Sequence, residues 1–444
     1  MPWSWGVYAT LVIITFFMIV EQLERRRAFG YEPVVLSQEP RLLKPRSPLD
    51  CPVCQRPHPQ PLWGHVHKPG VLPWPERKHP QGPHKHVCTA GHACPNPLCD
   101  YWGNTDSTFH ALVGNGPRHG IQQFKCQACK KRFSSRWGTA LYHLQATAWD
   151  VGRVLLAVNL GLSMADVQRL FGHSDTTFRL WLSRAGAHAE KVHAHFFRNL
   201  PIGHLQFDEL YTTLRDKAHD VWVWVAFDPQ TKLMPALLIG PRTQDLAHAL
   251  VHAVIQVLAP GCVPVCTSDG LNLYFYALTA HFGQWLTDPT TGKPKWHIAL
   301  ELLYGQVIKA YRRRKIFSVE RRMQLGQREE LQATLQRLGF TDSINTAFVE
   351  RINLTLRQGL AALTRRSWAT AQLTPALEAH LEWWRAWYHF CRPHQGLRQK
   401  LAVPQGRKGH QTARHYQDRT PAMAARLTDH VWSVEELLLC PMGE

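Results

Sequence analysis

The stretch INTAFVERINLTLRQ, residues 344–358, decides how the rest of this chain is interpreted. Asn345 is a suitable N-cap and good helix formers follow it, so the stretch is predicted to be a helix. An apolar stripe expected to face a core recurs every fourth residue, at Phe348, Ile352, Leu356 and Leu360. A second face groups a carboxylate, an amide and a guanidinium, from Glu350, Asn353 and Arg357. Alone this is an ordinary amphipathic helix. It becomes informative only if two carboxylates elsewhere in the chain require a third carboxylate to complete a metal site.

The charge of the 444-residue chain points to a polyanionic partner. Lys and Arg number 51 against 33 acidic residues, which gives a net charge of +18. Such a chain is expected to meet nucleic acid first and an anionic membrane second, and the alternative is that the charge serves solubility alone. Hydrophobic residues at 45% and charged residues at 19% indicate a globular chain of two or three domains and argue against a disordered one.

Residues 1–24 form a hydrophobic N-terminal segment. The first 20 residues carry no charged side chain and are a candidate membrane helix of borderline length, with three arginines at 25–27 that would keep the following chain cytoplasmic. The alternatives are a buried helix or a translation start placed too early. No basic residue precedes the apolar run and no small-residue cleavage site follows it, which argues against a signal peptide.

Residues 25–90 are predicted to be an extended linker rich in Pro and His. Fifteen of the chain's 30 Pro lie between Pro33 and Pro97, and repeated Pro blocks both helix and sheet. Within the linker, Cys51 and Cys54 make half of a metal site, which Cys88 or a nearby His would have to complete.

Residues 91–138 are predicted to form a zinc ribbon, with short strands at 121–125 and 131–133. Cys94 and Cys99 make one thiol pair, and Cys126 and Cys129 make a second. Two such pairs on tight turns supply the ligands of a tetrahedral structural Zn²⁺. Reduced thiolates in turn imply a cytosolic compartment rather than a secreted disulfide framework. The first pair is spaced more widely than usual, and coincidence is the alternative.

Residues 139–200 are predicted to be a helix-turn-helix DNA-binding domain. Helices are expected over 151–160, 164–171 and 176–184, with Ser163 capping the second and Gly172 turning the chain toward the third. The last helix of such a unit enters the major groove of DNA. The alternative is a set of packed helices that does not touch DNA.

After residue 200, strand patterns alternate with helical patterns, which predicts a mixed α/β domain over residues 201–398. Asp208 lies in the first expected strand, 205–211. Asp269 follows the fourth, 263–267, at the strand end where open α/β sheets place their sites. Glu350, on a helix packed across the sheet, would complete a triangle of carboxylates. Crowded carboxylates repel unless cations neutralise them, so two Mg²⁺ (or Mn²⁺) ions are expected, suited to phosphodiester chemistry.

Each acid also has a simpler interpretation. Asp208 could be a satisfied carboxylate of a strand end, with Glu209 as the alternative ligand on the opposite face of the strand. Asp269 could cap the helix that follows it. In a basic chain that also carries cysteine pairs, the three acids nevertheless reinforce one another.

Residues 94–398, more than half of the chain, resemble bacterial insertion-sequence transposases of the DDE type, in the insertion-sequence-one-like group. The matching stretches are ACPNP (93–97), the Cys126 and Cys129 pair, QFDEL (206–210), TSDG (267–270), YGQV (304–307), YRRR (311–314), NTAFVERIN (345–353) and RPH (392–394). The resemblance implies a ribonuclease-H-like catalytic fold in which Asp208, Asp269 and Glu350 are the metal ligands. It also implies that the cysteine pairs and the helix-turn-helix recognise terminal inverted repeats.

The activity that the resemblance implies is cleavage at the element's ends and joining of the freed 3′-OH to target DNA. We expect a homo-oligomer bound to double-stranded DNA to carry out this activity. The expected location is the bacterial cytoplasm, at the nucleoid, and a membrane tether is the alternative. A DNA-binding regulator with an inactive catalytic domain and a ribonuclease-H-like nuclease or resolvase are the rivals.

A basic insertion precedes the helix of Glu350 and is expected to hold substrate phosphates. The expected DNA-binding residues are Lys309, Arg312, Arg313, Arg314 and Lys315, with Asn353 and Arg357 on the helix itself. The alternative for Asn353 is a contact that supports a metal ligand. The alternative is a solvated basic surface. Residues 399–444 are expected to be a basic tail with a short helix near 434–439.

Overall fold

The computed structural model describes most of the chain from the end of the predicted linker onward. Residues 1–24, the pair Cys51 and Cys54, and Arg314 of the predicted DNA-binding set lie outside the described residues. Within the described ranges, none of the helices combines the length and the apolar character needed to cross a bilayer. These ranges are 70–75, 89, 91–214, 219–313, 315–341, 343–364, 374–406 and 413–442.

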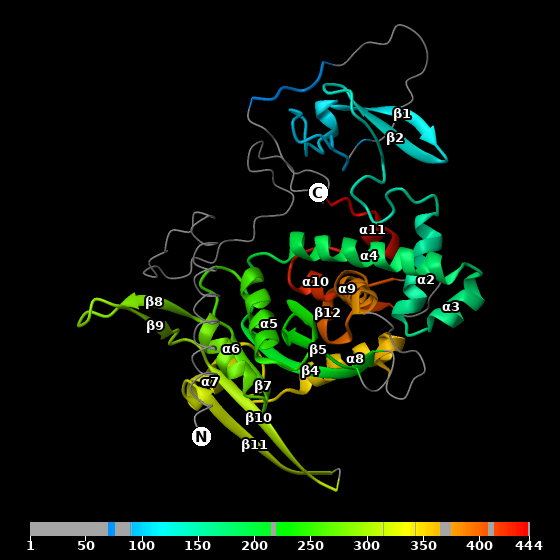
Figure 1. The fold of residues 1–444 in the computed structure, drawn as a ribbon. Coiled ribbons are helices and arrows are strands. Elements are labelled where there is room, and N and C mark those ends of the chain that lie inside the picture. Colours follow the sequence, from blue (N-terminus) through cyan, green and yellow to red (C-terminus); the bar gives the residue numbers. More distant parts are fainter. Residues whose placement is uncertain are drawn as a thin grey trace, which may run out of the picture. The chain divides into compact units, whose positions relative to one another are not determined.

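A small antiparallel sheet lies in the segment that carries the described cysteine pairs (Figure 1). Phe124 faces Phe133 across two of its strands, with the ring centroids 5.8 Å apart, and both side chains are buried together with the cysteines in a core of their own. The strands expected at 121–125 and 131–133 are therefore confirmed. The elements here are η1 (Ser107–Phe109), β1 (Leu112–Arg118), β2 (Ile121–Cys126) and β3 (Arg132–Ser134).

The helical segment that follows contains α2 (Ala148–Asn159), α3 (Met164–Phe171) and α4 (Asp175–Phe196). Ser163 caps α3 by accepting the amide N–H of Asp166, and Gly172 ends the helix in the left-handed conformation, as expected. The predicted end of the third helix at residue 184 is wrong. The helix runs for 22 residues because buried side chains continue at helical spacing as far as Val192.

The predicted mixed α/β architecture is confirmed by the main sheet. Among the described residues, six strands pair in the order β11-β10-β7-β4-β5-β6. The pairs β4–β7 and β7–β10 are parallel, and the other neighbours are antiparallel. The bounds are β4 (His204–Leu214), β5 (His219–Phe227), β6 (Ala236–Gly240), β7 (Val265–Asp269), β10 (Tyr304–Arg312) and β11 (Lys315–Leu325).

Helices cover both faces of this sheet, because successive strand residues point to opposite sides. Phe207 and Trp224 are buried on one face with α5 (Gln244–Val257) and α6 (Leu273–His281). Val223, Val225 and Leu210 are buried on the other face with α8 (Ala347–Gly359) and α9 (Thr374–Phe390). The helix expected from residues 344–358 is thus α8, and it packs on the face to which Asp208 belongs.

The helical segment and the main sheet share one core rather than forming two separate cores. Val192 of α4, Leu381 of α9 and Val225 of β5 belong to the same buried cluster. Helices α4 and α9 approach each other closely at Gly186, where a Cβ atom would lie 2.5 Å from the backbone oxygen of Ala379. Only glycine permits that contact without a shift of the backbone.

The remaining described elements lie around this frame. Helix α7 (Arg328–Arg337) buries Leu331 and Leu335 against Val307 of β10. The segment 399–444, expected to be a tail, instead contributes Leu437 and Leu438 to the core that contains α4, and the helix expected near 434–439 is confirmed. The other elements are β8 (Gly283–Thr287), β9 (Pro294–Ile298), η2 (Ala361–Leu363), η3 (Gln395–Leu397), β12 (Gln399–Gln405), β13 (Arg414–Gln417), α10 (Pro421–Ala424) and α11 (Val434–Leu439).

Candidate metal centre beside a basic ribbon

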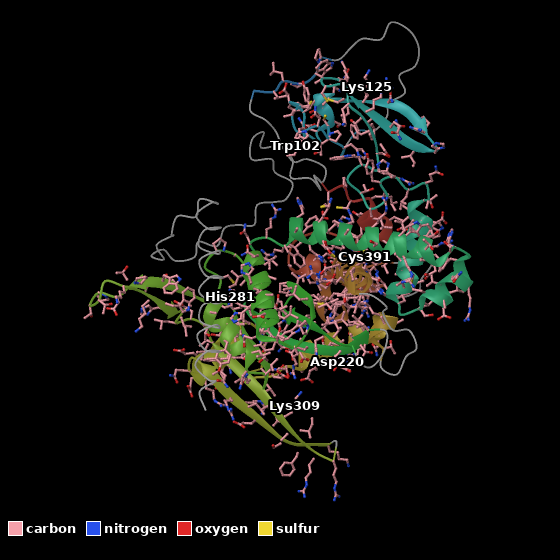
Figure 2. The ribbon with its side chains drawn as sticks, in the orientation of Figure 1. Trp102, Lys125, Asp220, His281, Lys309 and Cys391 are labelled. Carbon is pink, nitrogen blue, oxygen red and sulfur yellow. The ribbon has the colours of Figure 1, made fainter. Side chains whose placement is uncertain are left out.

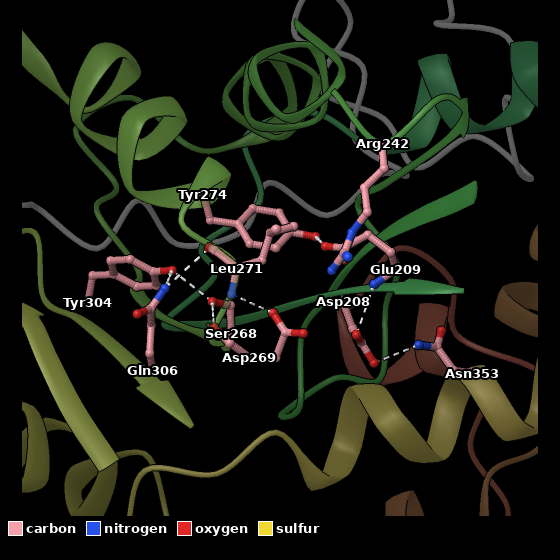
Figure 3. Close-up of polar contacts among 10 residues, drawn as sticks. All are labelled: Asp208, Glu209, Arg242, Ser268, Asp269, Leu271, Tyr274, Tyr304, Gln306 and Asn353. Carbon is pink, nitrogen blue, oxygen red and sulfur yellow. Dashed lines mark hydrogen bonds and ion pairs between the residues drawn. The ribbon is translucent and has the colours of Figure 1, made fainter. Parts of the chain in front are cut away.

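Asp208 and Asp269 come together on neighbouring strands of the main sheet. Strands β4 and β7 are parallel, and Phe207 pairs with Ser268, so the two aspartates occupy the next register position. Oxygen atoms of Asp208, Asp269 and Glu209 all lie within 4.8 Å of one another, and these residues could hold a metal ion. In Figure 3, Asp208 points toward Asn353, whereas Glu209 lies on the other side of the strand next to Tyr274 and Arg242.

Hydrogen bonds fix both aspartates from their surroundings. Oδ1 of Asp208 accepts the backbone N–H of Glu209 at 2.9 Å, and Oδ2 accepts the side-chain amide of Asn353 at 2.8 Å. Oδ1 of Asp269 accepts the backbone N–H of Leu271 at 3.0 Å, so this aspartate does cap the turn that follows it. One oxygen of Asp269 is therefore engaged locally, while both aspartates keep further lone pairs for a ligand.

The electrostatics of the group favour a cation. Burial, together with the negative charges of Asp269 and Glu209, raises the pKa of Asp208 to about 7. A bound divalent cation reverses that balance, because it stabilises the ionised carboxylates that now repel one another. Oxygen ligands on one Mg²⁺ lie about 2.9 to 4.1 Å apart, since Mg–O distances are close to 2.0–2.1 Å. Carboxylates already within 4.8 Å fit such an ion after small side-chain movements.

Glu209 belongs to the carboxylate group although it follows Asp208 on β4, where successive side chains point to opposite faces of the sheet. It follows Asp208 directly and reaches from the opposite face of β4, where the side chain is 1% exposed and the Tyr274 hydroxyl donates to Oε1. Arg242 lies 3.0 Å from Oε2, and burial raises the pKa of Glu209. In the sequence, the only indication that Glu209 could be a metal ligand was its position directly after Asp208.

Glu350 occupies a different position from the one expected. It lies in the first turn of α8 with 45% of its side chain exposed. Lys309 of β10 forms an ion pair with its Oε1, and the Thr346 hydroxyl donates to the same atom at 2.6 Å. Among the described residues, the close carboxylate group contains Glu209 and does not contain Glu350. The Glu350 charge is still close enough to raise the pKa of Asp208.

Asn353 and Arg357 lie where α8 meets β4. Asn353 is 8% exposed and binds Asp208, and its Oδ1 has no hydrogen-bond partner in the described part of the chain. Arg357 donates to the backbone oxygens of Leu363 at 3.3 Å and Tyr211 at 3.2 Å. Asn353 is therefore placed to orient Asp208, and its burial does not favour the DNA contact predicted for it.

Gln206 ties α8 to the strand of Asp208, and sequence reasoning assigned it no role. Thr346 is the N-cap of α8 and its side chain makes no capping bond, whereas the side chain of the expected Asn345 accepts the N–H of Ala347 at 3.3 Å. The fully buried Gln206 accepts the N–H of Val349 at 2.9 Å and donates to the carbonyl of Asn345 at 2.8 Å. An amide from the strand thus adds to the cap that Asn345 provides.

Strands β10 and β11 form a hairpin, here called the basic ribbon (Tyr304–Leu325), beside the carboxylates. Lys309, labelled in Figure 2, connects the ribbon to Glu350. The side chains of Arg312, Arg313 and Lys315 are exposed near the tip of the ribbon. Lys309, Arg312, Arg313 and Lys315 of the predicted DNA-binding set therefore lie together on the ribbon, whereas Asn353 and Arg357 lie on α8.

The four cysteines of the two predicted pairs are brought together beside the small sheet. Their sulfur atoms all lie within 4.8 Å, with Cys94 and Cys129 at 3.4 Å and Cys99 and Cys126 at 3.7 Å. A hydrogen bond from the Cys94 thiol lowers the pKa of Cys126 to about 5, and the same bond raises the pKa of Cys94. Tetrahedral Zn²⁺ with Zn–S bonds near 2.3 Å requires sulfur separations of about 3.8 Å, so this set fits a metal ion.

The geometry thus presents two groups able to bind metal: a thiol cluster and a carboxylate cluster beside a basic ribbon. A scan against protein-family models and a search of the curated proteins found no match to this chain.

Proposed function

We propose that this chain is a DNA transposase of the DDE type, which cleaves and joins DNA strands with the help of divalent metal ions. The observation that carries the proposal is the meeting of Asp208 and Asp269 on adjacent parallel strands, with the basic ribbon and α8 converging on the same place. Carboxylates that require a cation, next to a surface that attracts phosphate, suit phosphodiester chemistry.

The order of elements supports a ribonuclease-H-like fold for residues 201–398. Strands β4, β5 and β6 are linked as antiparallel neighbours, α5 leads to β7 beside β4, and α6 leads to β10 beside β7. Helix α8 then packs against the face that carries Asp208. This is the succession of strands and helices that the resemblance to DDE transposases implies, with an acid on the first strand, the fourth strand and the late helix.

In the proposed reaction the chain's own groups bind and orient the DNA. Divalent ions held by Asp208 and Asp269 would activate the attacking oxygen and stabilise the leaving oxygen. Asn353 holds the Asp208 carboxylate in place. Glu350 must leave Lys309 to reach a metal ion, and the released ammonium group would then be free to bind a substrate phosphate. The Lys309–Glu350 ion pair is thus a resting contact that substrate and metal replace together.

The remaining parts have roles in DNA recognition under this proposal. The cysteine cluster would hold a structural Zn²⁺ and form a zinc ribbon, and α3 with α4 would act as the helix-turn-helix that binds terminal inverted repeats. A homo-oligomer would bring two such ends together on double-stranded target DNA. The net charge of +18 supports a nucleic-acid partner.

The proposal is tested with the purified full-length chain, Mg²⁺ and labelled duplexes that carry each end of the DNA bordering the gene. Wild type should nick these duplexes and produce strand-transfer product, whereas Asp208→Asn, Asp269→Asn and Glu350→Gln should lose both activities. Asp245→Asn, an exposed acid in the first turn of α5, is the matched control and should remain active. Full activity of Asp269→Asn would show the catalytic assignment to be wrong.

The ion pair between Lys309 and Glu350 is the one observation that favours a rival, the DNA-binding regulator with an inactive catalytic domain. That rival predicts specific binding to the end duplexes without cleavage in either Mg²⁺ or Mn²⁺. A nuclease or resolvase would cleave the duplexes and never join them. The same gel therefore separates all three functions.

A further inference from the structure

The outer half of the basic ribbon carries large apolar side chains that nothing in the described structure covers. Ile316 is 57% exposed, Phe317 is 70% exposed and Val319 is 40% exposed, all within β11. Single exposed apolar residues are ordinary on protein surfaces, but a contiguous group at the end of a projecting hairpin is characteristic of a contact surface. In Figure 1 the ribbon extends past the other strands of the main sheet.

The backbone of the ribbon presents Phe317 in particular. Ala310 pairs with Ser318 and Tyr311 pairs with Ile316, so Phe317 lies in a bulge without a cross-strand partner. A bulge of this kind redirects a side chain and increases the local twist of the strands. The neighbouring strand β7 pairs with β10 over Tyr304–Val307, so in the described residues the bulge lies beyond that pairing.

The charge of the ribbon indicates what its apolar tip meets. Seven basic residues and one acid lie between positions 304 and 325, and Arg312, Arg313 and Lys315 are exposed next to Phe317. A two-stranded ribbon fits a DNA groove, and proteins that bend DNA insert Phe, Leu or Ile between base pairs while basic residues hold the phosphates. An anionic membrane would also attract such a tip, but the base of the ribbon lies beside the carboxylate cluster, where Val307 pairs with Asp269.

We propose that Phe317, supported by Ile316, is a wedge that inserts between base pairs of the bound duplex and unstacks them. The position of the wedge relative to the reacting phosphate rests on the proposed transposase function. Lys309 pairs with Val319, and Phe317 lies two residues farther along β11, a distance of about 7 Å at 3.4 Å per residue. Base pairs rise by about 3.4 Å, so the opened step lies about two base pairs from the phosphate that Lys309 binds. The wedge would thereby loosen the duplex next to the site of cleavage.

The test compares the binding of the full-length chain to a duplex and to the same duplex with two adjacent mismatched pairs. Because the mismatch is already unstacked, wild type should bind it about tenfold more tightly than the paired duplex. Phe317→Ala should lose this preference, and Phe317→Trp should retain it. Val403→Ala in β12, where Val403 is 73% exposed, is the matched control and should behave as wild type. A 2-aminopurine placed in the paired duplex should brighten with wild type and not with Phe317→Ala.

Each outcome decides the inference. Equal affinity of wild type for the two duplexes, or an unchanged preference in Phe317→Ala, overturns the wedge, even if cleavage and strand transfer succeed. A Phe317-dependent preference without any cleavage supports the wedge while the transposase proposal fails. Phe317-dependent binding to phosphatidylserine vesicles with no binding to either duplex would overturn both proposals in favour of a membrane contact.

Discussion

Replacing Gln206 with Leu should loosen α8 from the strand that carries Asp208. The substitution keeps a buried side chain of similar size but removes the acceptor for the Val349 N–H and the donor to the Asn345 carbonyl. The carbonyl retains a long contact from the Thr267 hydroxyl at 3.4 Å, whereas the Val349 N–H has no other acceptor in the described part of the chain. The substitution therefore leaves one buried donor unpaired and one acceptor poorly paired.

The cost follows from those two groups. A buried donor or acceptor left without a partner costs about 1–3 kcal/mol, so the free energy of unfolding should fall by about 2–4 kcal/mol, with the larger part from Val349. The first turn of α8 should open more often, because one of its capping partners is gone. Glu350 lies in that turn, so the Mg²⁺ concentration needed for the proposed strand cleavage should rise as the helix end becomes less well placed.

Urea unfolding at neutral pH measures the stability change, and hydrogen exchange of the peptide that contains Val349 measures the opening of α8. Gln244→Leu is the matched control, since Gln244 donates to the Leu273 carbonyl at 3.0 Å and is remote from α8 in sequence and contacts. The control should leave exchange at Val349 unchanged. If Gln206→Leu unfolds at the wild-type urea concentration and exchange at Val349 is as slow as before, the strand amide does not cap this helix and the reasoning is wrong.

Two further predictions concern acid and metal. Burial lowers the pKa of His188 and His380 to about 4 and that of His204 to about 3. The unfolded chain protonates these histidines below about pH 6.5 and the folded chain does not, so each histidine should lower the free energy of unfolding by about 2 kcal/mol at pH 5. Asp208, whose pKa is raised to about 7, takes up its proton in the folded state first and should offset about 2 kcal/mol of that loss. These four groups together should contribute a loss of about 4 kcal/mol between pH 7 and pH 5. His193 and His389, whose pKa values burial also lowers, add to that loss, and equal stability at the two pH values in urea unfolding without divalent ions would contradict the prediction. The proposed Zn²⁺ at the cysteine cluster predicts that chelation, or Cys126→Ser, abolishes metal binding and unfolds the small sheet, while the circular dichroism of the main sheet persists. Cys262→Ser is the control, and wild type purified without bound zinc would refute the assignment.

The elements of the main sheet could be predicted because their sequences carry strong local signals. The β-branched and aromatic run that became β5 is one example, and the apolar spacing of α8 is another. The exact buried face of α8 depended on its neighbours. Phe348 packs against the core as expected but stays half-buried, with the Lys232 ammonium 4.1 Å from its ring centre, whereas Val349, outside the expected stripe, is fully buried.

The site was less predictable because its contacts are tertiary. Asp208 and Asp269 were identifiable from strand patterns, since parallel strands bring such positions together. The approach of Glu209 from the other face required Tyr274 and Arg242, which are distant in sequence. Gln206 gave no signal, because a capping residue supplied from another element has no sequence spacing of its own.

The close approach of α4 and α9 at Gly186 has a consequence for how this chain can be divided. Residues 139–200 do not make an autonomous folding unit, because the apolar face of α4 is completed by side chains more than 150 residues away in sequence, such as Leu381. A fragment ending at residue 200 would expose that face and aggregate. Exchanging this segment with that of another protein would require a compatible α9 as well. Residues 139–200 and α9 are therefore expected to be retained together in evolution. Packing, and not a linker, fixes the orientation of α4 relative to the carboxylates.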